Sequence, residues 1–270
     1  MLKRLPTINQ EKPNVLIHGN VINRTKNRIF NIFPGFGKIW SFNRTSRDNW
    51  ILLKSKVVHN NSRVIDIGAG TCPYKNLFLH CEYISHDFGK LEDVQLQERK
   101  GYGDIKIYSD ITSIPVDDSS FDVALCTEVL EHVPEPIMAI KEIGRILKPN
   151  GILLLSAPLR SALHQMPYHY YGGFTPVWFI KYLNEAGFTD IKIDPVCGIF
   201  NFYGEESLRV FIALSPFNKG KYYEKIILLP IWIITFPWLA IVCPIIFFLL
   251  DKLNIGFGNT TGYRVEARKK

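Results

Sequence analysis

Residues 64–71 read VIDIGAGT, an apolar run that ends in a glycine-rich turn. The apolar part is typical of a buried strand, and the glycines let the backbone turn sharply and approach a ligand closely. In a parallel sheet this turn falls at the carboxyl edge, where ligands bind. A strand-to-helix turn also forms without a ligand, so its meaning depends on the segments around it.

Short apolar segments alternate with amphipathic ones from residue 63 onward. Residues 136–147 and 175–187 are typical helices, the second with Thr175 as N-cap and Gly187 as stop. Upstream, a helix capped by Thr45 or Ser46 is expected to bury Trp50, Leu53 and Val57 on one face. The candidate strands are RVIDIG (63–68), EYISHD (82–87), IKIYSD (105–110), FDVALC (121–126), GILLLSAP (151–158), TDIKID (189–194) and TGYRVEARK (261–269). The alternation predicts parallel strands joined by right-handed crossovers, with helices on both faces.

A carboxylate follows the glycine turn at the distance expected for a ribose ligand. Asp87 ends the second candidate strand, about twenty residues after Asp66. A nicotinamide dinucleotide would use the same two features. However, Pro73 stands where the third glycine of its fingerprint belongs, which disfavours a pyrophosphate site.

Three further segments complete the pattern. Asp110-Ile111 closes the third strand, residues 121–126 run into TEVLEHV, and LKPNG at 147–151 turns into the fifth strand. With them, residues 50 to 200 resemble the class I S-adenosylmethionine-dependent methyltransferases, especially the small-molecule branch similar to ubiquinone and menaquinone biosynthetic enzymes. The resemblance implies an α/β, doubly wound, Rossmann-like seven-stranded sheet, mostly parallel with the last strand antiparallel. It also implies S-adenosyl-L-methionine as the cofactor.

The resemblance assigns roles to residues around that cofactor. Asp66 and the glycine turn would surround its methionine part, an acidic residue at Asp87 would hold the ribose, and Asp110-Ile111 would lie beside the adenine. Residues 127–129 would close over the sulfonium. The expected cofactor residues are Asp66, Gly68, Ala69, Gly70, Thr71, Asp87, Phe88, Asp110, Ile111, Thr127, Glu128 and Val129. The sequence departs from the family at Cys72, where a third small glycine is common, so a tighter turn is expected.

The segment from Pro158 to Phe174 covers the acceptor site in that family. It holds two histidines and three tyrosines, and His164, His169 and Tyr168 are the candidate catalytic residues. Methyl transfer depends mostly on alignment, and a base is needed only for a hydroxyl or a cationic amine. Two readings stay open: these side chains deprotonate an acceptor, or they only pack the loop. His132 is expected to orient the cofactor loop or to cap its helix.

Other chemistries find no support in the sequence. Glu128 and Glu131, three residues apart, are expected to meet a helix dipole or to bind backbone amides rather than to act as a glycosidase pair. The five cysteines are widely spaced without a C-x-x-C pair, which predicts reduced thiols on the cytosolic side and no metal site. No H-E-x-x-H, G-x-S-x-G or Walker pattern occurs.

A charge-free run of 25 residues, Ile226 to Leu250, is the main departure from a soluble enzyme. It is long enough to span a bilayer, but the last strand must return to the sheet that holds residues 189–194. Prolines at 230, 237 and 244 each interrupt the helix. We expect a kinked helix or helical hairpin that dips into one leaflet. The alternatives are a buried homodimer seam and a true span with the final strand outside the sheet.

The net charge of +7 is concentrated at the start of the chain. Residues 1–60 carry eleven Lys or Arg against two acids, which suits anionic headgroups, and no motif supports a nucleic-acid partner. We expect a basic irregular lead-in (1–44), a methyltransferase core (45–217), a hydrophobic membrane or interface segment (218–254) and a C-terminal strand (255–270).

Together these features predict a cytoplasmic enzyme attached peripherally or monotopically to a membrane. It would transfer a methyl group from S-adenosylmethionine to a small or lipid-linked acceptor. The alternative is a non-catalytic cofactor-binding or membrane-scaffolding protein with the same fold.

Overall fold

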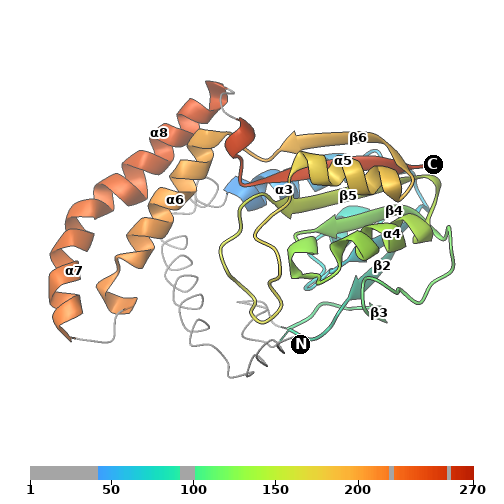
Figure 1. The fold of residues 1–270 in the computed structure, drawn as a ribbon, viewed down its shortest axis with the longest axis horizontal. Helices are drawn as coiled ribbons and strands as arrows, with labels where there is room; N and C mark the ends of the chain where they lie inside the picture. The colour runs from blue at the N-terminus through green and yellow to red at the C-terminus, as the bar shows by residue number, and fades with distance from the viewer. Residues whose placement is uncertain (1–41, 92–100, 219–221, 254–256) are drawn as a thin grey trace, which may run out of the picture.

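The computed structural model describes residues 42–91, 101–218, 222–253 and 257–270. The basic lead-in predicted for residues 1–44 therefore lies almost wholly outside the described residues. The described part consists of a sheet covered by helices on both faces and a helical hairpin at one end of it (Figure 1).

The sheet has seven strands in the order β3-β2-β1-β4-β5-β7-β6. The strands are β1 (Arg63–Ile67), β2 (Glu82–Asp87), β3 (Ile107–Tyr108), β4 (Phe121–Thr127), β5 (Leu147–Pro158), β6 (Phe188–Pro195) and β7 (Gly262–Lys269). Strands β1 to β5 pair in parallel, whereas β7 runs antiparallel to both β5 and β6. The predicted fold class is confirmed, and so is the place of each predicted strand.

Helices cover the two faces of the sheet, and each face has its own apolar core. The helices are α3 (Phe42–Ser55), α4 (Pro136–Ile146) and α5 (Pro176–Glu185), with a 3₁₀ turn at Lys75–Phe78. Helices α4 and α5 bury Ile140 and Phe179 against one face, and α3 and the 3₁₀ turn bury Trp50 and Phe78 against the other. Thr175 caps α5 as predicted, because its hydroxyl accepts the Trp178 N–H at 3.2 Å.

The prediction for the first described helix is partly wrong. Helix α3 begins at Phe42, before the expected cap at Thr45 or Ser46. Trp50 is buried as expected, but Leu53 and Val57 are 63% and 70% exposed. Ile51, the next residue, is buried beside Trp50 in the core. The face of the helix that packs on the sheet is therefore rotated relative to the predicted face.

The hydrophobic run belongs to a helical hairpin between β6 and β7 (Figure 1). The hairpin consists of α6 (Ile199–Ala213), a 3₁₀ turn (Pro216–Asn218), α7 (Tyr222–Thr235), a π-helical stretch (Phe236–Val242), α8 (Cys243–Leu250) and 3₁₀ turns at Asp251–Leu253 and Phe257–Asn259. The chain leaves the sheet after β6 and returns into β7, which pairs on both sides. The alternative of a span with the final strand outside the sheet is therefore wrong.

The two arms of the hairpin pack on each other. Leu208, Phe211 and Ile212 of α6 form a small core with Ala240, and the Trp232 ring stacks on Phe211 with centroids 5.0 Å apart. At the base of the hairpin, the Asp251 carboxylate accepts hydrogen bonds from the N-terminus of α6. Among the described residues the hydrophobic run therefore packs mainly on α6, with a further contact between Phe248 and Phe42 of α3, whose ring centroids lie 6.2 Å apart.

Candidate active site

The glycine turn after β1 is packed on one side and open on the other. Gly68 and Gly70 have φ angles of +69° and +54°, in the left-handed region that glycine favours. A Cβ on Gly68 would lie 2.4 Å from Cγ2 of Val129, whereas a Cβ on Gly70 would meet nothing within 4 Å. Cys72 also adopts a positive φ, +54°, although it is not glycine. The open side at Gly70 is a cradle where a ligand can approach the backbone.

Asp87 holds this turn in place. One carboxylate oxygen accepts the Gly70 N–H at 2.8 Å and the other accepts the Gly89 N–H at 2.9 Å. Each carboxylate oxygen has two lone pairs, so one on each remains for ligand hydroxyls. The adjoining Phe88 ring meets the Tyr168 ring edge-on at 5.7 Å. Asp87 and Phe88 thus connect the turn to the predicted acceptor loop.

Asp66 is buried beneath the turn, in β1. The Tyr83 hydroxyl of β2 donates a hydrogen bond to its carboxylate. Burial raises the pKa of Asp66 to about 7, the negative charge of Asp87 adds to this, and the Tyr83 hydrogen bond opposes it. Tyr83 was not among the predicted site residues, and only the pairing of β1 with β2 brings it there.

The segment after β4 bends sharply beside the turn. Glu128 has a φ of +55°, its N–H donates to the Ser156 carbonyl at 2.9 Å, and its carboxylate accepts the Ser156 hydroxyl at 2.9 Å. Val129 then packs on Gly68. These contacts bring the predicted residues Thr127 to Val129 next to the glycine turn. Ser156 of β5, which was not among the predicted site residues, holds Glu128 in this position.

Asp110 and Ile111 follow β3, farther along the same edge. One oxygen of Asp110 accepts both the N–H of Thr112 at 2.9 Å and its hydroxyl at 2.8 Å. Ile111 is buried in the core beneath. Asp110 thus fixes a local turn, and its second oxygen stays available to a ligand.

The acceptor loop between β5 and α5 folds back over the residues that follow β4. Its base is closed by a hydrogen bond from the Ser161 N–H to the Gly172 carbonyl at 2.7 Å. Farther out, the N–H groups of Tyr170 and Tyr171 donate to the Glu131 carbonyl at 2.9 and 3.2 Å. The loop therefore lies against the residues that follow β4, and its role in covering an acceptor stays a prediction.

Three histidines meet under this loop. The ring centroids of His132 and His164 lie 4.7 Å apart, and those of His164 and His169 lie 4.8 Å apart. Burial, together with the neighbouring His164, lowers the pKa of His132 to about 4 and lowers that of His169. His132 was expected to orient the cofactor loop or to cap its helix, which stays a prediction, and its Nδ1 donates to the Tyr168 carbonyl at 2.7 Å. The structure thus brings all three predicted catalytic residues, His164, His169 and Tyr168, around His132.

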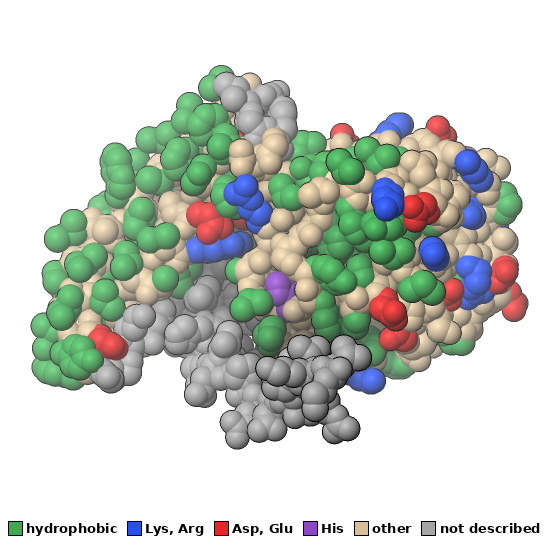
Figure 2. All heavy atoms as spheres, viewed as in Figure 1, with side chains coloured by type: hydrophobic (Ala, Val, Ile, Leu, Met, Phe, Trp, Pro, Cys, Tyr) green, Lys and Arg blue, Asp and Glu red, His purple; other side chains and the backbone are tan. Residues whose placement is uncertain are grey.

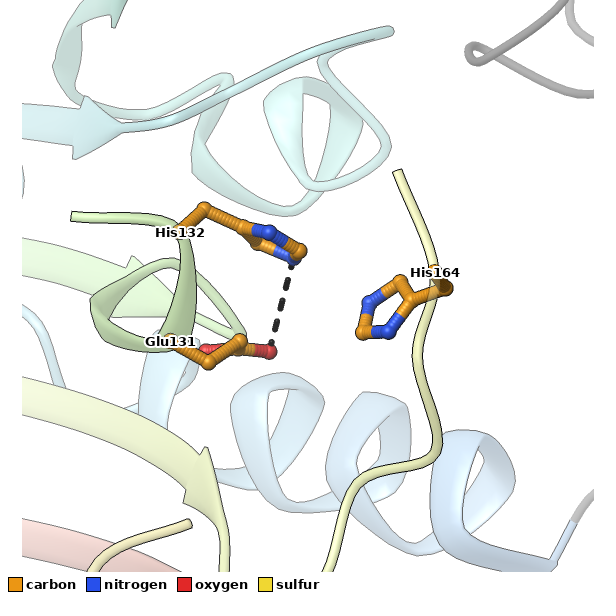
Figure 3. Close-up of side chains that lie close together, drawn as sticks. All are labelled: Glu131, His132 and His164. Atoms are coloured by element: carbon orange, nitrogen blue, oxygen red, sulfur yellow. Dashed lines mark ion pairs between the residues drawn. The ribbon is translucent and has the colours of Figure 1, made fainter. Parts of the chain in front are cut away.

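Glu131 points toward these histidines (Figure 3). The segment Leu130–His132 is a single 3₁₀ turn, so the expected interaction of Glu128 and Glu131 with a helix dipole is not found. Glu131 is 1% exposed, and its Oε2 has no hydrogen-bond partner among the described residues. Burial, followed by the charge of Glu128, raises the pKa of Glu131.

The glycine turn and the residues around it fit the cofactor that the resemblance implied. An open turn at Gly70, two carboxylates and a bent strand end surround the cradle, without a phosphate-binding helix N-terminus. Carboxylates and backbone groups suit a cationic sulfonium and ribose hydroxyls better than a pyrophosphate. Asp66, Asp87 and the residues after β4 would hold S-adenosylmethionine there.

Comparisons with known proteins agree with this geometry. A family model described as a methyltransferase domain matches residues 65–155. Demethylmenaquinone methyltransferase from Staphylococcus haemolyticus is 26% identical over 183 residues, which cover 63% of this chain and 74% of that relative. The enzyme of the same name from Staphylococcus carnosus is 25% identical over 181 residues, covering 62% and 73%.

A solved structure supports the fold. It is described as a sarcosine dimethylglycine methyltransferase from Galdieria sulphuraria, and the alignment covers 84% of this chain and 86% of that one, with a TM-score of 0.51 and 14% identity. At that identity the likeness concerns the fold alone. Given the matched domain, the curated relatives and the cradle described above, this chain is a class I S-adenosylmethionine-dependent methyltransferase, similar to enzymes of menaquinone biosynthesis.

Proposed function

We propose that this methyltransferase modifies a small or lipid-linked acceptor at the cytosolic face of a membrane, and that the helical hairpin rests on that membrane. The observation that carries the proposal is that the hairpin and the acceptor loop arise from one edge of the sheet. Parallel strands end at the same edge, where the glycine turn and the acceptor loop follow β1 and β5. The hairpin follows β6 there, and Gly262 of the returning strand pairs with Pro158 at the end of β5.

Direct contacts join the acceptor loop to the hairpin base. The Arg160 guanidinium lies over the Phe202 ring of α6, 5.0 Å from its centroid, and donates to Asn259 at 3.0 Å. A surface that holds the hairpin would therefore hold the acceptor loop close by. An acceptor dissolved in that surface would then reach the site without crossing water.

The hairpin presents an apolar surface of the kind that meets lipid. Residues Tyr222–Leu253 form one helical run with the length and composition of a membrane span. Only 11% of its most apolar 18-residue stretch is buried. Figure 2 shows hydrophobic side chains over much of the hairpin, whereas charged side chains gather over the sheet. The most exposed apolar residues of this run are Tyr222, Tyr223, Ile226, Ile227, Ile233, Ile234, Trp238, Leu249 and Leu253.

The other arm of the hairpin favours attachment over spanning. Helix α6 lies along the apolar run and carries Glu205, Glu206 and Arg209. Charged side chains on an isolated helix are costly at the centre of a bilayer. An arrangement in the membrane plane leaves these charges in water and immerses the exposed side of the apolar run.

The chain's own residues provide alignment and proton transfer. S-adenosylmethionine, when bound, supplies a methyl group on a cationic sulfur. Asp66, Asp87 and Glu128 orient that ligand, and the acceptor loop excludes water from it. A His132 with a pKa of about 4 is neutral at pH 7, so its ring cannot serve as a general acid.

Methyl transfer is tested with radiolabelled S-adenosylmethionine and two acceptor pools, a membrane lipid extract and a soluble metabolite extract. We expect labelled product from the lipid extract. Asp87→Asn, which removes one charge from the carboxylate that holds the glycine turn, should lose cofactor binding and labelling together. Label found only in the soluble pool would overturn the lipid-linked acceptor, and no cofactor binding at millimolar concentration would overturn the whole site.

Membrane attachment is tested by vesicle flotation with a triple variant, Ile227→Gln, Ile234→Gln and Trp238→Gln. These side chains are exposed, so the α6 contacts stay intact, unlike in a deletion of the run. A matched control changes three exposed apolar residues elsewhere, Val57→Gln, Leu79→Gln and Val177→Gln. We expect only the hairpin variant to stop floating. If it instead converts a dimer to a monomer and the wild type never floats, the homodimer seam is correct.

A further inference from the structure

We propose that Glu131, His132 and His164 form a binding site for a divalent transition-metal ion beneath the acceptor loop. One ligand atom from each of the three residues lies within 4.8 Å of those of the other two, and their side chains converge on a common gap (Figure 3). Zn²⁺ bonds to nitrogen and oxygen at about 2.0–2.2 Å and so separates its ligand atoms by about 3.4 Å. Small side-chain rotations close the remaining distance.

The hydrogen bonds of the two histidines leave the correct nitrogen for a metal. His132 Nδ1 lies 2.7 Å from the Tyr168 carbonyl, and His164 Nδ1 lies 2.9 Å from the Ala162 carbonyl. A carbonyl only accepts, so each Nδ1 carries the proton and each Nε2 of a neutral ring presents a lone pair. Metal-binding histidines are held in this way, with the second ring nitrogen donating to a backbone carbonyl.

Two buried polar atoms in this cluster lack a hydrogen-bond partner among the described residues. His132 Nε2 lies 3.8 Å from Glu131 Oε1, beyond hydrogen-bond distance. Glu131 Oε2 and His169 Nε2 are buried and have no partner among the described residues. Protonating Glu131 would not remove the problem at Oε2, because an O–H there would also lack a partner. A cation is the group that satisfies several facing lone pairs at once.

The donor set indicates which kind of ion would bind. Two imidazoles and a carboxylate, with no thiolate, suit Zn²⁺ and the neighbouring first-row ions, and three protein ligands leave a position open. His169 lies close enough to supply a further nitrogen after a loop adjustment, since its ring centroid is 5.7 Å from that of His132. The spacing of the cysteines and the lack of an H-E-x-x-H motif predicted no metal site, and that prediction missed this cluster because His164 lies 32 positions after His132 along the chain.

The place of the site suggests its use, and this point alone rests on the proposed function. The ligands belong to the segment after β4 and to the acceptor loop, so an open position on the ion would adjoin the loop that the resemblance assigns to the acceptor. An oxygen of the acceptor would complete the coordination. The ion would also fasten the acceptor loop to the segment after β4 in addition to the hydrogen bond between His132 and Tyr168.

The test measures metal binding directly. The tag-free protein is stripped with EDTA, titrated with Zn²⁺ by calorimetry, and titrated in parallel with Co²⁺, whose visible absorption reports nitrogen and oxygen coordination. We expect one equivalent of metal. Glu131→Gln and His164→Ala should each weaken binding at least tenfold and alter the Co²⁺ band, whereas His59→Asn, at an exposed histidine outside the cluster, should not.

The outcomes separate this inference from the proposed function. Cofactor titration of the same samples verifies that each variant is folded. Absence of metal binding, or binding that both cluster variants retain, would overturn the metal site and show that water fills the gap or that a cysteine holds the ion. Metal bound by the cluster with no lipid product would leave the site standing and refute the proposed acceptor.

Discussion

At the residue scale, Gly68 and Gly70 separate packing from ligand binding. Both have positive φ, so an alanine costs about 1–2 kcal/mol of backbone strain at either position. Only at Gly68 does the new Cβ collide with Val129, which adds about 1–3 kcal/mol of overpacking. We expect Gly68→Ala to have the lower melting temperature of the two variants. Gly70→Ala, whose Cβ enters the cradle, should keep more of its stability but lose more of its cofactor affinity. Calorimetry and thermal melts of the pair decide this, and equal melting temperatures would contradict it.

Asp66 makes the stability of the protein depend on pH. The unfolded carboxyl releases its proton near pH 3.8 and the folded one near pH 7, so the folded state binds more protons between these values. Its contribution is therefore complete below about pH 4 and is lost as the pH rises through 7, at up to about 1.4 kcal/mol per pH unit. Asp66→Asn, which cannot ionise, should flatten the melting temperature between pH 5 and 8. An unchanged slope in the variant would show that another group is responsible.

The sequence could predict the site residues that stand at a fixed spacing from a strand end. The glycine turn and Asp87 follow strand ends at a fixed spacing, so their meeting at one edge follows from the fold. Tyr83, Ser156 and Glu131 have no such spacing. Each gains its role from a register between strands or from the path of a loop, as when Ser156 reaches Glu128 only because β5 pairs with β4.

At the scale of elements, Asp251 joins the two arms of the hairpin at its base. Its carboxylate accepts the N–H groups of Gly198 and Asn201, each at 3.1 Å, and the Asn201 side-chain amide at 2.7 Å. The start of α6 thus has its cap 50 positions away along the chain. Asp251→Ala leaves the buried Asn201 amide unpaired, which costs about 1–3 kcal/mol.

We expect Asp251→Ala to lower the urea midpoint while Asp251→Asn, which keeps one acceptor oxygen, loses less. Cofactor affinity should change little in either variant, because the glycine turn lies on other strands. If Asp251→Ala were as stable as the wild type, the cap would contribute nothing and the hairpin would be held by its apolar contacts alone.

Periodicity could predict the elements of the sheet but not the partner of the apolar run. The alternation of apolar and amphipathic segments located all seven strands, and the terminal residues Thr175 and Gly187 located the ends of α5. For the run after residue 222, length suggested a span and the three prolines suggested kinks, whereas the structure has a continuous helix with a π-helical stretch. The partner, α6, reads as an ordinary helix, and its pairing with the run depends on contacts such as Ser207 to the Leu239 carbonyl at 3.1 Å.

At the scale of the whole molecule, charge and apolar surface are expected to act together on a membrane. The net charge is +7, and Lys225 and Lys252 lie exposed near the two ends of the apolar helical run. A lysine near an anionic surface contributes about 1 kcal/mol, an effect that salt screens, whereas immersion of apolar side chains is not screened. The two contributions therefore differ in their response to ionic strength.

We expect binding to vesicles with anionic lipids to weaken but persist at high salt, and binding to neutral vesicles to change little. Lys225→Gln with Lys252→Gln should reduce binding to anionic vesicles by roughly tenfold or more at low salt, following about 1 kcal/mol for each lysine. The same double variant should bind neutral vesicles as the wild type does, since its apolar residues are intact. If high salt released the wild type completely from anionic vesicles, the attraction would be electrostatic alone, and the apolar face of the hairpin would have to be covered by something other than lipid.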